Sequence, residues 1–202
     1  MEIEYLLRIF ISSVFVNNVI LSRFLGLCSF IAISKEIKPA VAMSFAVLFV
    51  ITMSSLITWG IFRFLLAPFH IEYLRTISFI LVIATFVQLV EMVIRKFAPA
   101  LYRFFGIYLP LITVNCAVLG VAVLNSEMFF QNGKPISGSF VYSLFQGICV
   151  GLGYLVAMVL MSSIRHRLEL ADVPKAFQGP AIGFIIAAIL SMAFLGFSGF
   201  RI

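Results

Sequence analysis

Apolar residues occupy six long runs along the chain, and short polar segments separate the runs. The runs cover residues 5–33, 39–62, 73–94, 101–124, 138–161 and 178–200. Each run is long enough for a helix that crosses the hydrocarbon core of a membrane, which takes about 20 residues. Inside hydrocarbon a helix satisfies its own backbone hydrogen bonds, whereas a loop does not. The pattern therefore predicts an all-α integral membrane protein with six transmembrane helices.

The breaks between the runs are short and rich in charged residues, glycine and proline. They fall at residues 35–39, 68–72, 95–99, 132–135 and 165–169. Glycine and proline punctuate secondary structure, and charged residues are costly in hydrocarbon, so these segments are expected to be loops. Six helices and short loops use nearly all of the 202 residues, so we expect a single membrane domain over residues 1–202.

The composition agrees with a membrane location. Hydrophobic residues make up 63% of the chain and charged residues only 11%. An ordinary soluble domain is about 45–50% apolar and about 25% charged. A soluble fold with this composition would have too little polar surface to face water. Any cofactor is therefore expected to lie within the helix bundle or to come from a partner.

The basic residues are distributed unequally between the two predicted sides of the membrane. The breaks after the first, third and fifth runs contain eight of them: Lys35, Lys38, Arg95, Lys96, Arg103, Arg165, Arg167 and Lys175. The opposite side contains five: Arg8, Arg63, Arg75, Lys134 and Arg201. Cytoplasmic loops carry the excess of lysine and arginine. We therefore expect the odd-numbered breaks to be cytoplasmic and both termini to face outside.

Two of the six runs are interrupted internally. Polar residues break the first run, namely Asn17, Asn18, Ser22 and Arg23, and a proline at position 110 lies inside the fourth. A proline removes an intrahelical hydrogen bond and clashes with the preceding turn. The first helix of each half of the chain is therefore expected to be interrupted.

The two halves are interpreted as diverged repeats, one over about residues 1–100 and the other over about residues 101–202. Each half has an odd number of predicted spans, so the second would be inserted upside down relative to the first. Inverted repeats of this kind place functional residues near the membrane midplane, on broken helices.

Each interruption is followed by a cysteine, Cys28 in the first half and Cys116 in the second. A helix that restarts at Gly26 or Pro110 points its N-terminal dipole at that depth, which favours a thiolate. Two thiolates suit a soft metal but are too few for an iron–sulfur cluster, which takes four ligands. The missing pair would have to come from a partner chain. The alternative is that both cysteines are small buried hydrophobes.

The third cysteine, Cys149, has a different setting. It lies between Gly147 and Gly151, and small residues at this spacing allow two helices to approach closely. A packing role is therefore expected for Cys149. The three cysteines form no CxxC pair, so neither a disulfide framework nor a self-contained zinc site is expected.

Three further residues are candidates for ion binding or charge compensation: Arg23, Glu91 and Asn115. A cation within a span is costly and often functional, although a long side chain also extends to the membrane interface. Glu91 stands four residues before Arg95, a spacing that also suits a structural ion pair on a helix. The polar residues predicted at membrane depth are Asn17, Asn18, Gln88, Asn115 and Gln146. Such groups tie helices together more often than they bind cations.

Catalytic motifs are missing from the sequence. It contains no HExxH, no P-loop, no dinucleotide fingerprint and no candidate Ser/His/Asp triad. The only histidines, His70 and His166, fall in breaks on opposite predicted sides and are not expected to hold one haem together. The chain is therefore not expected to catalyse a reaction alone.

Seven further segments are distinctive: VNN at 16–18, FLGLC at 24–28, YLRT at 73–76, EMVIRK at 91–96, PLITVNCAVLG at 110–120, ADVP at 171–174 and GFSG at 196–199. Together these segments resemble the A-type subunits of Rnf electron-transport complexes. The resemblance extends from end to end, and the PLITVNCAVLG stretch is the most specific part. The E-type subunit of the sodium-pumping NADH:quinone reductase is similar to this family. The segment over residues 126–139 departs from the pattern as an extended outer loop.

The resemblance implies a function. It implies a membrane subunit of an ion-translocating ferredoxin:NAD oxidoreductase in the bacterial inner membrane, not catalytic by itself. It further implies a [2Fe–2S] cluster held jointly with a homologous E-type subunit of opposite orientation, and coupling of electron transfer to Na⁺ or H⁺ transport. Cys28 and Cys116 are the ligands that it implies on this chain, and Cys149 has no such counterpart.

Three alternatives remain open on the sequence. The chain could be the E-type subunit of a sodium-translocating NADH:quinone reductase, with the same fold and cluster. It could be a small secondary transporter, because inverted repeats and broken helices fit that class too. It could also be a structural membrane scaffold, in which both Cys28 and Cys116 would be replaceable.

Overall fold

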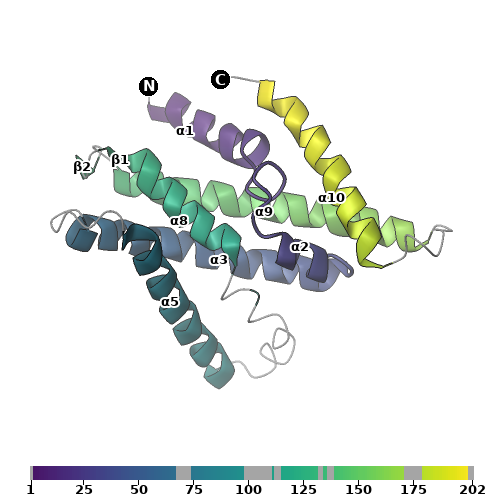
Figure 1. The fold of residues 1–202 in the computed structure, drawn as a ribbon, viewed down its shortest axis with the longest axis horizontal. Coiled ribbons are helices and arrows are strands. Elements are labelled where there is room, and N and C mark those ends of the chain that lie inside the picture. The colour runs from purple at the N-terminus through teal and green to yellow at the C-terminus, as the bar shows by residue number, and fades with distance from the viewer. Residues whose placement is uncertain are drawn as a thin grey trace. The chain divides into compact units, whose positions relative to one another are not determined.

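The computed structural model describes residues 2–66, 74–97, 111, 115–131, 134–135, 139–170 and 179–199. Nearly all of these residues are helical (Figure 1). The α-helices are α1 (Glu2–Ile11), α2 (Leu27–Ile33), α3 (Ile37–Ile61), α5 (Arg75–Phe97), α8 (Cys116–Phe129), α9 (Ser139–Glu169) and α10 (Pro180–Leu195). Two π-helical segments, η1 (Ser12–Val16) and η2 (Phe62–Leu66), extend α1 and α3, and the 3₁₀ segment η5 (Gly196–Gly199) follows α10.

Three of the described helices are long and apolar enough to cross a membrane, over Ile37–Phe64, Arg75–Met92 and Phe140–Leu168. Shorter apolar helices cover Leu6–Val16, Cys116–Met128 and Pro180–Leu195. Each of the six predicted runs thus contains a helix. A helical membrane protein is confirmed at this level, whereas six crossings and an inverted repeat stay predictions.

The chain divides into two compact units. The first unit contains residues 1–48 and 149–202, and the second contains residues 49–148. The long helices α3 and α9 each contribute one part to each unit. The two units interleave along the sequence, so this division by contacts leaves the predicted repeats over residues 1–100 and 101–202 untested.

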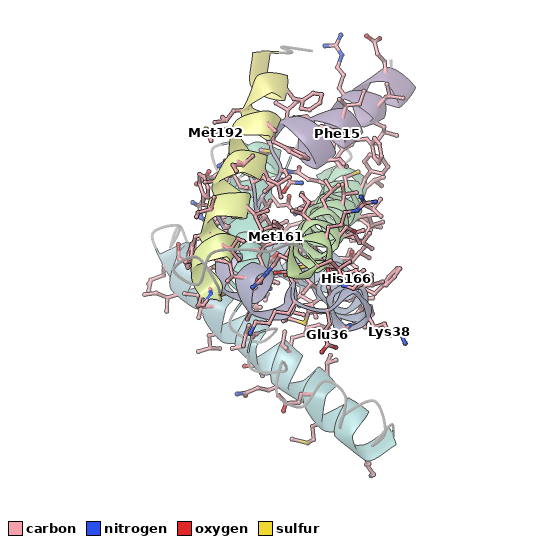
Figure 2. All side chains as sticks on the ribbon, turned by 90° about the vertical axis from the view of Figure 1, so that its right-hand side faces the viewer. Phe15, Glu36, Lys38, Met161, His166 and Met192 are labelled. Carbon is pink, nitrogen blue, oxygen red and sulfur yellow. The ribbon has the colours of Figure 1, made fainter. Side chains whose placement is uncertain are left out.

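The core of the first unit forms around the C-terminal part of α9. Its largest fully buried side chains include Tyr154, Met158 and Met161, together with Phe30 of α2. Figure 2 shows Met161 in the interior and Met192 on the outer side of α10. Met192 is 64% exposed. It is one of many large apolar side chains that face outward, as suits a surface in contact with lipid.

The second unit packs α5 and α8 against the end of α3 and the start of α9. Phe79 of α5 and Val118 and Val121 of α8 are almost fully buried. Gly147 of α9 lies close to α3, because a Cβ placed there would stand 3.0 Å from the hydroxyl oxygen of Ser55. Small residues thus bring these two helices together, as the GxxxG pattern predicts.

The predicted loop at residues 165–169 is wrong, because α9 continues through it to Glu169. Arg165 is buried and bonded within the first unit, so its charge does not end the helix. His166, also expected in a loop, lies in the last turn of α9. The last described side chains of α9 nevertheless lie at the same end of this unit as Glu36 and Lys38, as Figure 2 shows for His166.

Part of the segment expected to be an extended loop over residues 126–139 forms regular secondary structure. Helix α8 continues to Phe129, and β1 (Phe130–Gln131) then pairs antiparallel with β2 (Lys134–Pro135). Among the described residues, this pairing of two-residue strands is β-structure in an otherwise largely helical fold. It forms a small hairpin beyond the apolar part of α8.

Candidate functional site

The first predicted run is broken where the sequence indicates. The chain leaves the π-helical segment η1 at Asn17 and resumes a helix at Leu27. Asn18 is fully buried and satisfies the backbone at this break. Its Nδ2 donates to the carbonyl oxygens of Val14 at 3.1 Å and Gly153 at 2.9 Å. The predicted interruption of the first helix is therefore confirmed.

The side-chain oxygen of Asn18 also accepts hydrogen bonds at this break. Its Oδ1 accepts from the backbone N–H groups of Ile20 at 3.1 Å and Leu21 at 3.4 Å. Two donors that left the helical pattern are thereby paired inside the protein, where an unpaired N–H is costly. Asn18 is thus a structural residue that ties the break to α9, the interpretation favoured for polar residues at this depth.

Helix α2 restarts after a short left-handed stretch. Gly26 precedes it with φ 86°, a conformation that glycine adopts without steric cost, and Phe24 has φ 55°. Cys28 is the second residue of α2 and is exposed. The next residue, Ser29, is buried and donates its hydroxyl to the carbonyl oxygen of Gly26 at 2.9 Å.

Helix α8 begins with the second candidate cysteine. Cys116 is its first residue and is exposed. Asn115 caps this helix, because its Oδ1 accepts from the backbone N–H of Ala117 at 3.0 Å. The backbone carbonyl of Asn115 also accepts from the N–H of Val118 at 3.1 Å. The expected restart at Pro110 lies outside the described residues, and the described helix starts at Cys116.

Both candidate ligands therefore share one local design, an exposed thiol in the first turn of a helix that follows non-helical backbone. Unpaired N–H groups and the helix dipole favour negative charge at such a position. Among the described residues no three histidine, cysteine or acidic side chains gather to hold a metal ion. Each cysteine thus presents a single soft donor at the surface of its own unit, which suits a metal centre completed by another chain.

Cys149 is placed differently and confirms the packing interpretation. It is 1% exposed and lies between Gly147 and Gly151 on α9. A Cβ at Gly151 would stand 2.8 Å from the Cγ of Leu48 and 3.1 Å from its Cα. The close helix contact leaves no room for a larger residue there, and the buried thiol fills space beside it.

The three candidates for ion binding or charge compensation lie in different settings. Arg23 is exposed, and Glu91 is partly exposed on α5. The side chain of Arg95, the expected partner of Glu91, lies outside the described residues, as does His70. Asn115 acts as the cap of α8, and a role in ion binding stays a prediction for all three candidates.

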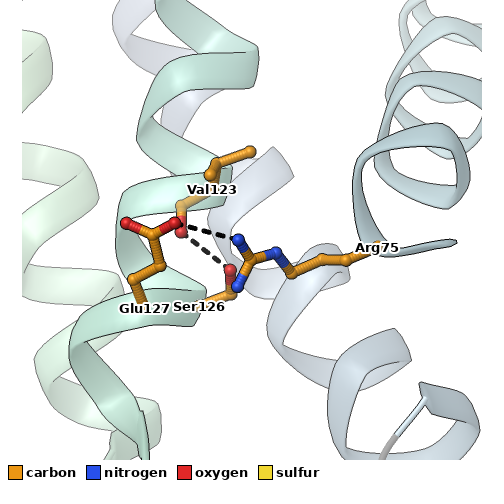
Figure 3. A network of polar contacts seen from close by, with 4 residues as sticks. All are labelled: Arg75, Val123, Ser126 and Glu127. Carbon is orange, nitrogen blue, oxygen red and sulfur yellow. Dashed lines mark hydrogen bonds and ion pairs between the residues drawn. The ribbon is translucent and has the colours of Figure 1, made fainter. Parts of the chain in front are cut away.

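The second unit contains a polar cluster that the sequence does not predict. A small pocket is lined by Thr58, Trp59, Phe79, Ala122, Asn125, Ser126 and Ser143. Asn125 donates its Nδ2 to the Ser143 hydroxyl at 3.2 Å, while its buried Oδ1 accepts no hydrogen bond from a described residue. Beside this pocket Arg75 pairs with Glu127 at 2.9 Å, and Ser126 donates to the carbonyl oxygen of Val123 (Figure 3).

Arg165 is the buried cation of the first unit, although its sequence position suggests a cytoplasmic loop. It is 6% exposed, and its Nη1 donates to the carbonyl oxygen of Ile31 and to the hydroxyl of Ser34, both at 2.8 Å. Helical spacing is the signal that could reveal it. Tyr154, Met158, Met161 and Arg165 follow one another at intervals of four, three and four residues on one face of α9.

The sequence also matches a known family. A family model described as "Rnf-Nqr subunit, membrane protein" matches residues 6–201 of the chain. The chain belongs to the Rnf–Nqr family. This membership confirms the resemblance that its segments carry and agrees with the apolar helices of the structure.

Within the Rnf–Nqr family the chain is similar to several subunits over nearly its whole length. It is 49% identical over 193 residues to the A subunit of the proton-translocating ferredoxin:NAD(+) oxidoreductase complex of Clostridium ljungdahlii, covering 96% of each chain. It is 47% identical over 197 residues to the A subunit of the Na(+)-translocating ferredoxin:NAD(+) oxidoreductase complex of Acetobacterium woodii, covering 98% of each. It is 51% identical over 193 residues to the A subunit of the ion-translocating oxidoreductase complex of an Azoarcus species, covering 96% of each.

Proposed function

We propose that this chain is the A-type membrane subunit of an ion-translocating ferredoxin:NAD oxidoreductase complex. The observation that supports this most strongly is the joint occurrence of two features. The chain is similar over nearly its whole length to subunits with that name, and its two exposed cysteines each lie in the first turn of a helix. In this role the chain takes part in a redox-driven ion translocase and catalyses nothing alone.

The relatives favour this complex over the sodium-translocating NADH:quinone reductase. Two of them are named as ferredoxin:NAD(+) oxidoreductase subunits, one proton-translocating and the other Na(+)-translocating. The chain is 49% identical to the first and 47% identical to the second, so similarity alone does not separate the two ions. The coupling ion in this proposal is therefore Na⁺ or H⁺.

The proposed electron carrier is a [2Fe–2S] cluster shared between this chain and a homologous E-type subunit of opposite orientation. The donor set fits such a cluster, because Cys28 and Cys116 supply two of the four thiolates and a partner of the same design supplies two more. Exposed thiols suit a centre at an interface between chains, whereas the buried thiol of Cys149 does not. When bound, the cluster would accept and donate single electrons within the membrane.

The chain's own contribution is to hold these two thiols in place. Asn18 and Asn115 pair the backbone N–H groups where the chain leaves helical geometry, so the breaks do not collapse or unravel. Cys28 and Cys116 then stand in the first turns of α2 and α8, one in each unit. A rigid donor geometry reduces the rearrangement that accompanies each electron transfer.

Electrostatics gives a physical reason for coupling electron transfer to the transport of a cation. A negative charge added within a low-dielectric membrane is costly unless a cation compensates it. Arg23, Glu91 and Asn115 remain the candidates for that compensation or for an ion route. If Arg23 or Glu91 serves the ion, its replacement will reduce ion transport in vesicles more than electron transfer, and equal loss of both would exclude that role.

The proposed topology has six transmembrane helices arranged as two inverted repeats of three, in the inner membrane, with both termini outside. The arrangement is supported by the starts of α2 and α8, because each of these helices has a candidate cysteine in its first turn. It is also supported within the first unit, where Arg165 near the end of α9 bonds to Ile31 and Ser34. The segments after the first and fifth predicted spans therefore lie at one end of that unit.

The decisive experiment examines iron and paramagnetic resonance in this chain purified together with its homologous partner. Wild type is compared with Cys28→Ser and Cys116→Ser, and Cys149→Ser is the matched control. We expect the reduced sample to show one [2Fe–2S] signal that the first two substitutions abolish and the control keeps. Iron content should fall in parallel.

The other outcomes separate the alternatives. A signal that survives in all three variants would show that the cysteines are packing residues and would overturn the cluster assignment. Solute uptake by liposomes that contain the chain alone would then identify a secondary transporter. Without uptake, a structural scaffold would be the remaining interpretation.

A further inference from the structure

The helix that carries Cys28 is too short to hold its own position. Helix α2 has seven residues, whereas isolated helices shorter than about 12–15 residues are marginal in water. It is also separated from its neighbours, by the non-helical residues before Leu27 and by the turn between Ile33 and Ile37. The position of Cys28 therefore depends on what contacts α2 from outside.

The N-terminal end of α2 is fixed by Tyr154 of α9. The hydroxyl of Ser29 lies 2.9 Å from that of Tyr154, and it also bonds to the carbonyl oxygen of Gly26. Ser29 is fully buried and Tyr154 is 1% exposed. A buried hydroxyl pair of this kind resists displacement, because separation would leave polar groups without water. Ser29 is adjacent to Cys28 in the sequence.

The C-terminal end of α2 is fixed by Arg165 of the same helix, α9. Its guanidinium donates to the carbonyl oxygen of Ile31 and to Ser34, at 2.8 Å each. Carbonyls at a helix C-terminus are the negative end of the dipole, where a cation is stabilised. Charge-assisted hydrogen bonds are shorter and about twice as strong as neutral ones. Arg165 thus carries its buried charge to the end of the helix that presents Cys28.

Both contacts come from one rigid helix. Tyr154 and Arg165 lie on the same face of α9, with the fully buried Met158 and Met161 between them. Their separation along α9 is fixed at about 16 Å by the helical rise of about 1.5 Å per residue. Helix α9 therefore holds both ends of α2 at a set spacing, and neither end moves without breaking a buried polar contact.

We infer that Tyr154 and Arg165 are positioning residues for Cys28. They clamp α2 at its two ends, and the guanidinium of Arg165 places a buried positive charge at the C-terminal end of the seven-residue helix that carries Cys28. The consequence for a bound cluster rests on the proposed function. The clamp itself does not, because it concerns residues of this chain alone.

The first test measures the clamp in the full chain without a cluster. Amide hydrogen exchange of α2 is compared in wild type, Arg165→Met, Arg165→Lys and Tyr154→Phe, with the exposed Arg167→Met as matched control. We expect Arg165→Met to accelerate exchange in α2 at least tenfold, Tyr154→Phe to do so to a smaller extent, and Arg165→Lys to restore protection. Exchange in α8 should not change. Unaltered exchange of α2 in both Arg165→Met and Tyr154→Phe would overturn the clamp.

The second test uses a property that a merely structural role would not alter. The reduction potential of the [2Fe–2S] signal is titrated in the assembled complex. Loss of the buried positive charge in Arg165→Met should shift the potential to more negative values, Arg165→Lys should stay close to wild type, and Arg167→Met should be unchanged. Faster exchange with an unchanged potential would leave Arg165 a structural residue and overturn its assignment to Cys28.

The two proposals fail in different ways. If Cys28→Ser keeps the cluster signal, the proposed function fails, whatever happens to α2. If Cys28→Ser loses the signal while Arg165→Met leaves both exchange and potential unchanged, only the positioning role fails. If Arg165→Met does not fold, Tyr154→Phe still tests the clamp by hydrogen exchange of α2, because it removes only a single hydroxyl.

Discussion

The helices α2 and α8 each carry a candidate cysteine in their first turn, but they are supported in different ways. Helix α8 is fourteen residues long and begins with a side-chain cap from Asn115. Helix α2 has seven residues and begins at Gly26, which has no side chain to act as a cap. Its support comes instead from Asn18 before it and from α9 beside it.

This difference shows that a cysteine in the first turn of a helix is held in two ways. In the second unit an adjacent capping residue supports the helix, and in the first unit contacts with residues distant in the sequence support it. A helix that begins with a side-chain cap pairs part of its N-terminal backbone through a residue adjacent to it in the sequence. A short helix must take its stability from packing and from long-range hydrogen bonds. The position of Cys28 should therefore respond to changes far away in the sequence, and that of Cys116 to changes next to it.

The largest effect is expected from Asn18→Leu. The substitution leaves the buried N–H groups of Ile20 and Leu21 without their acceptor, at roughly 1–3 kcal/mol for each orphaned group. We expect the free energy of unfolding to fall by about 2–6 kcal/mol. Denaturant titration of the full chain in detergent micelles measures it.

The neighbouring Asn17→Leu is the control for that prediction. Asn17 is exposed, and its side chain donates to the hydroxyl of Ser12 at 3.1 Å. Its loss should change the stability by less than about 1 kcal/mol, because an exposed group regains a partner. Equal effects of the two substitutions would show that the break does not depend on the long-range contact to α9.

An intermediate effect is expected from Gly151→Ala, which tests α9 as the support of α2. The new methyl group would stand within 3.1 Å of the Cα of Leu48, so backbone has to move. Overpacking of this kind costs about 1–3 kcal/mol. Because α9 would shift, exchange in α2 should also accelerate, whereas exchange in α8 should not.

Gly60→Ala provides the matched control on α3. Nothing lies within 4 Å of a Cβ added at Gly60, so the substitution meets no neighbour among the described residues. Alanine favours a helix over glycine by about 1 kcal/mol, and a small gain in stability is expected. A loss at Gly60 as large as that at Gly151 would indicate a general sensitivity of the helices rather than a contact at α9.

Much of the fold follows from the sequence because it depends on simple periodicity. The apolar runs predict the helices, and the polar residues near Asn18 predict the break in the first one. The position of Cys28 near the start of a helix also follows, since the expected restart at Gly26 is two residues before it. The family resemblance adds the expected ligands, and the family itself is confirmed.

The environment of the candidate site does not follow from the sequence, because it is built from distant residues. The sequence alone places Arg165 in a loop, since charges usually end a membrane helix, whereas its buried guanidinium bonds to the Ile31 carbonyl oxygen and the Ser34 hydroxyl, which lie far away in the sequence. Tyr154 is one of many aromatic residues in apolar runs, and nothing in its sequence neighbourhood distinguishes it. Asn115 is a candidate for ion binding on the sequence, whereas the structure uses it as a helix cap.

The smallest effect is expected from Asn115→Ala, and it completes the contrast between the two helices. Loss of a capping side chain costs about 1 kcal/mol, and the rest of α8 remains to hold its position. Exchange should accelerate in the first turn of α8, next to Cys116, while α2 stays protected. Asn115→Asp, which keeps the capping oxygen, should restore protection of that turn. If Asn115→Ala instead loosened the whole of α8, the helix would depend on its cap as fully as α2 depends on α9, and the proposed contrast between local and tertiary support would be wrong.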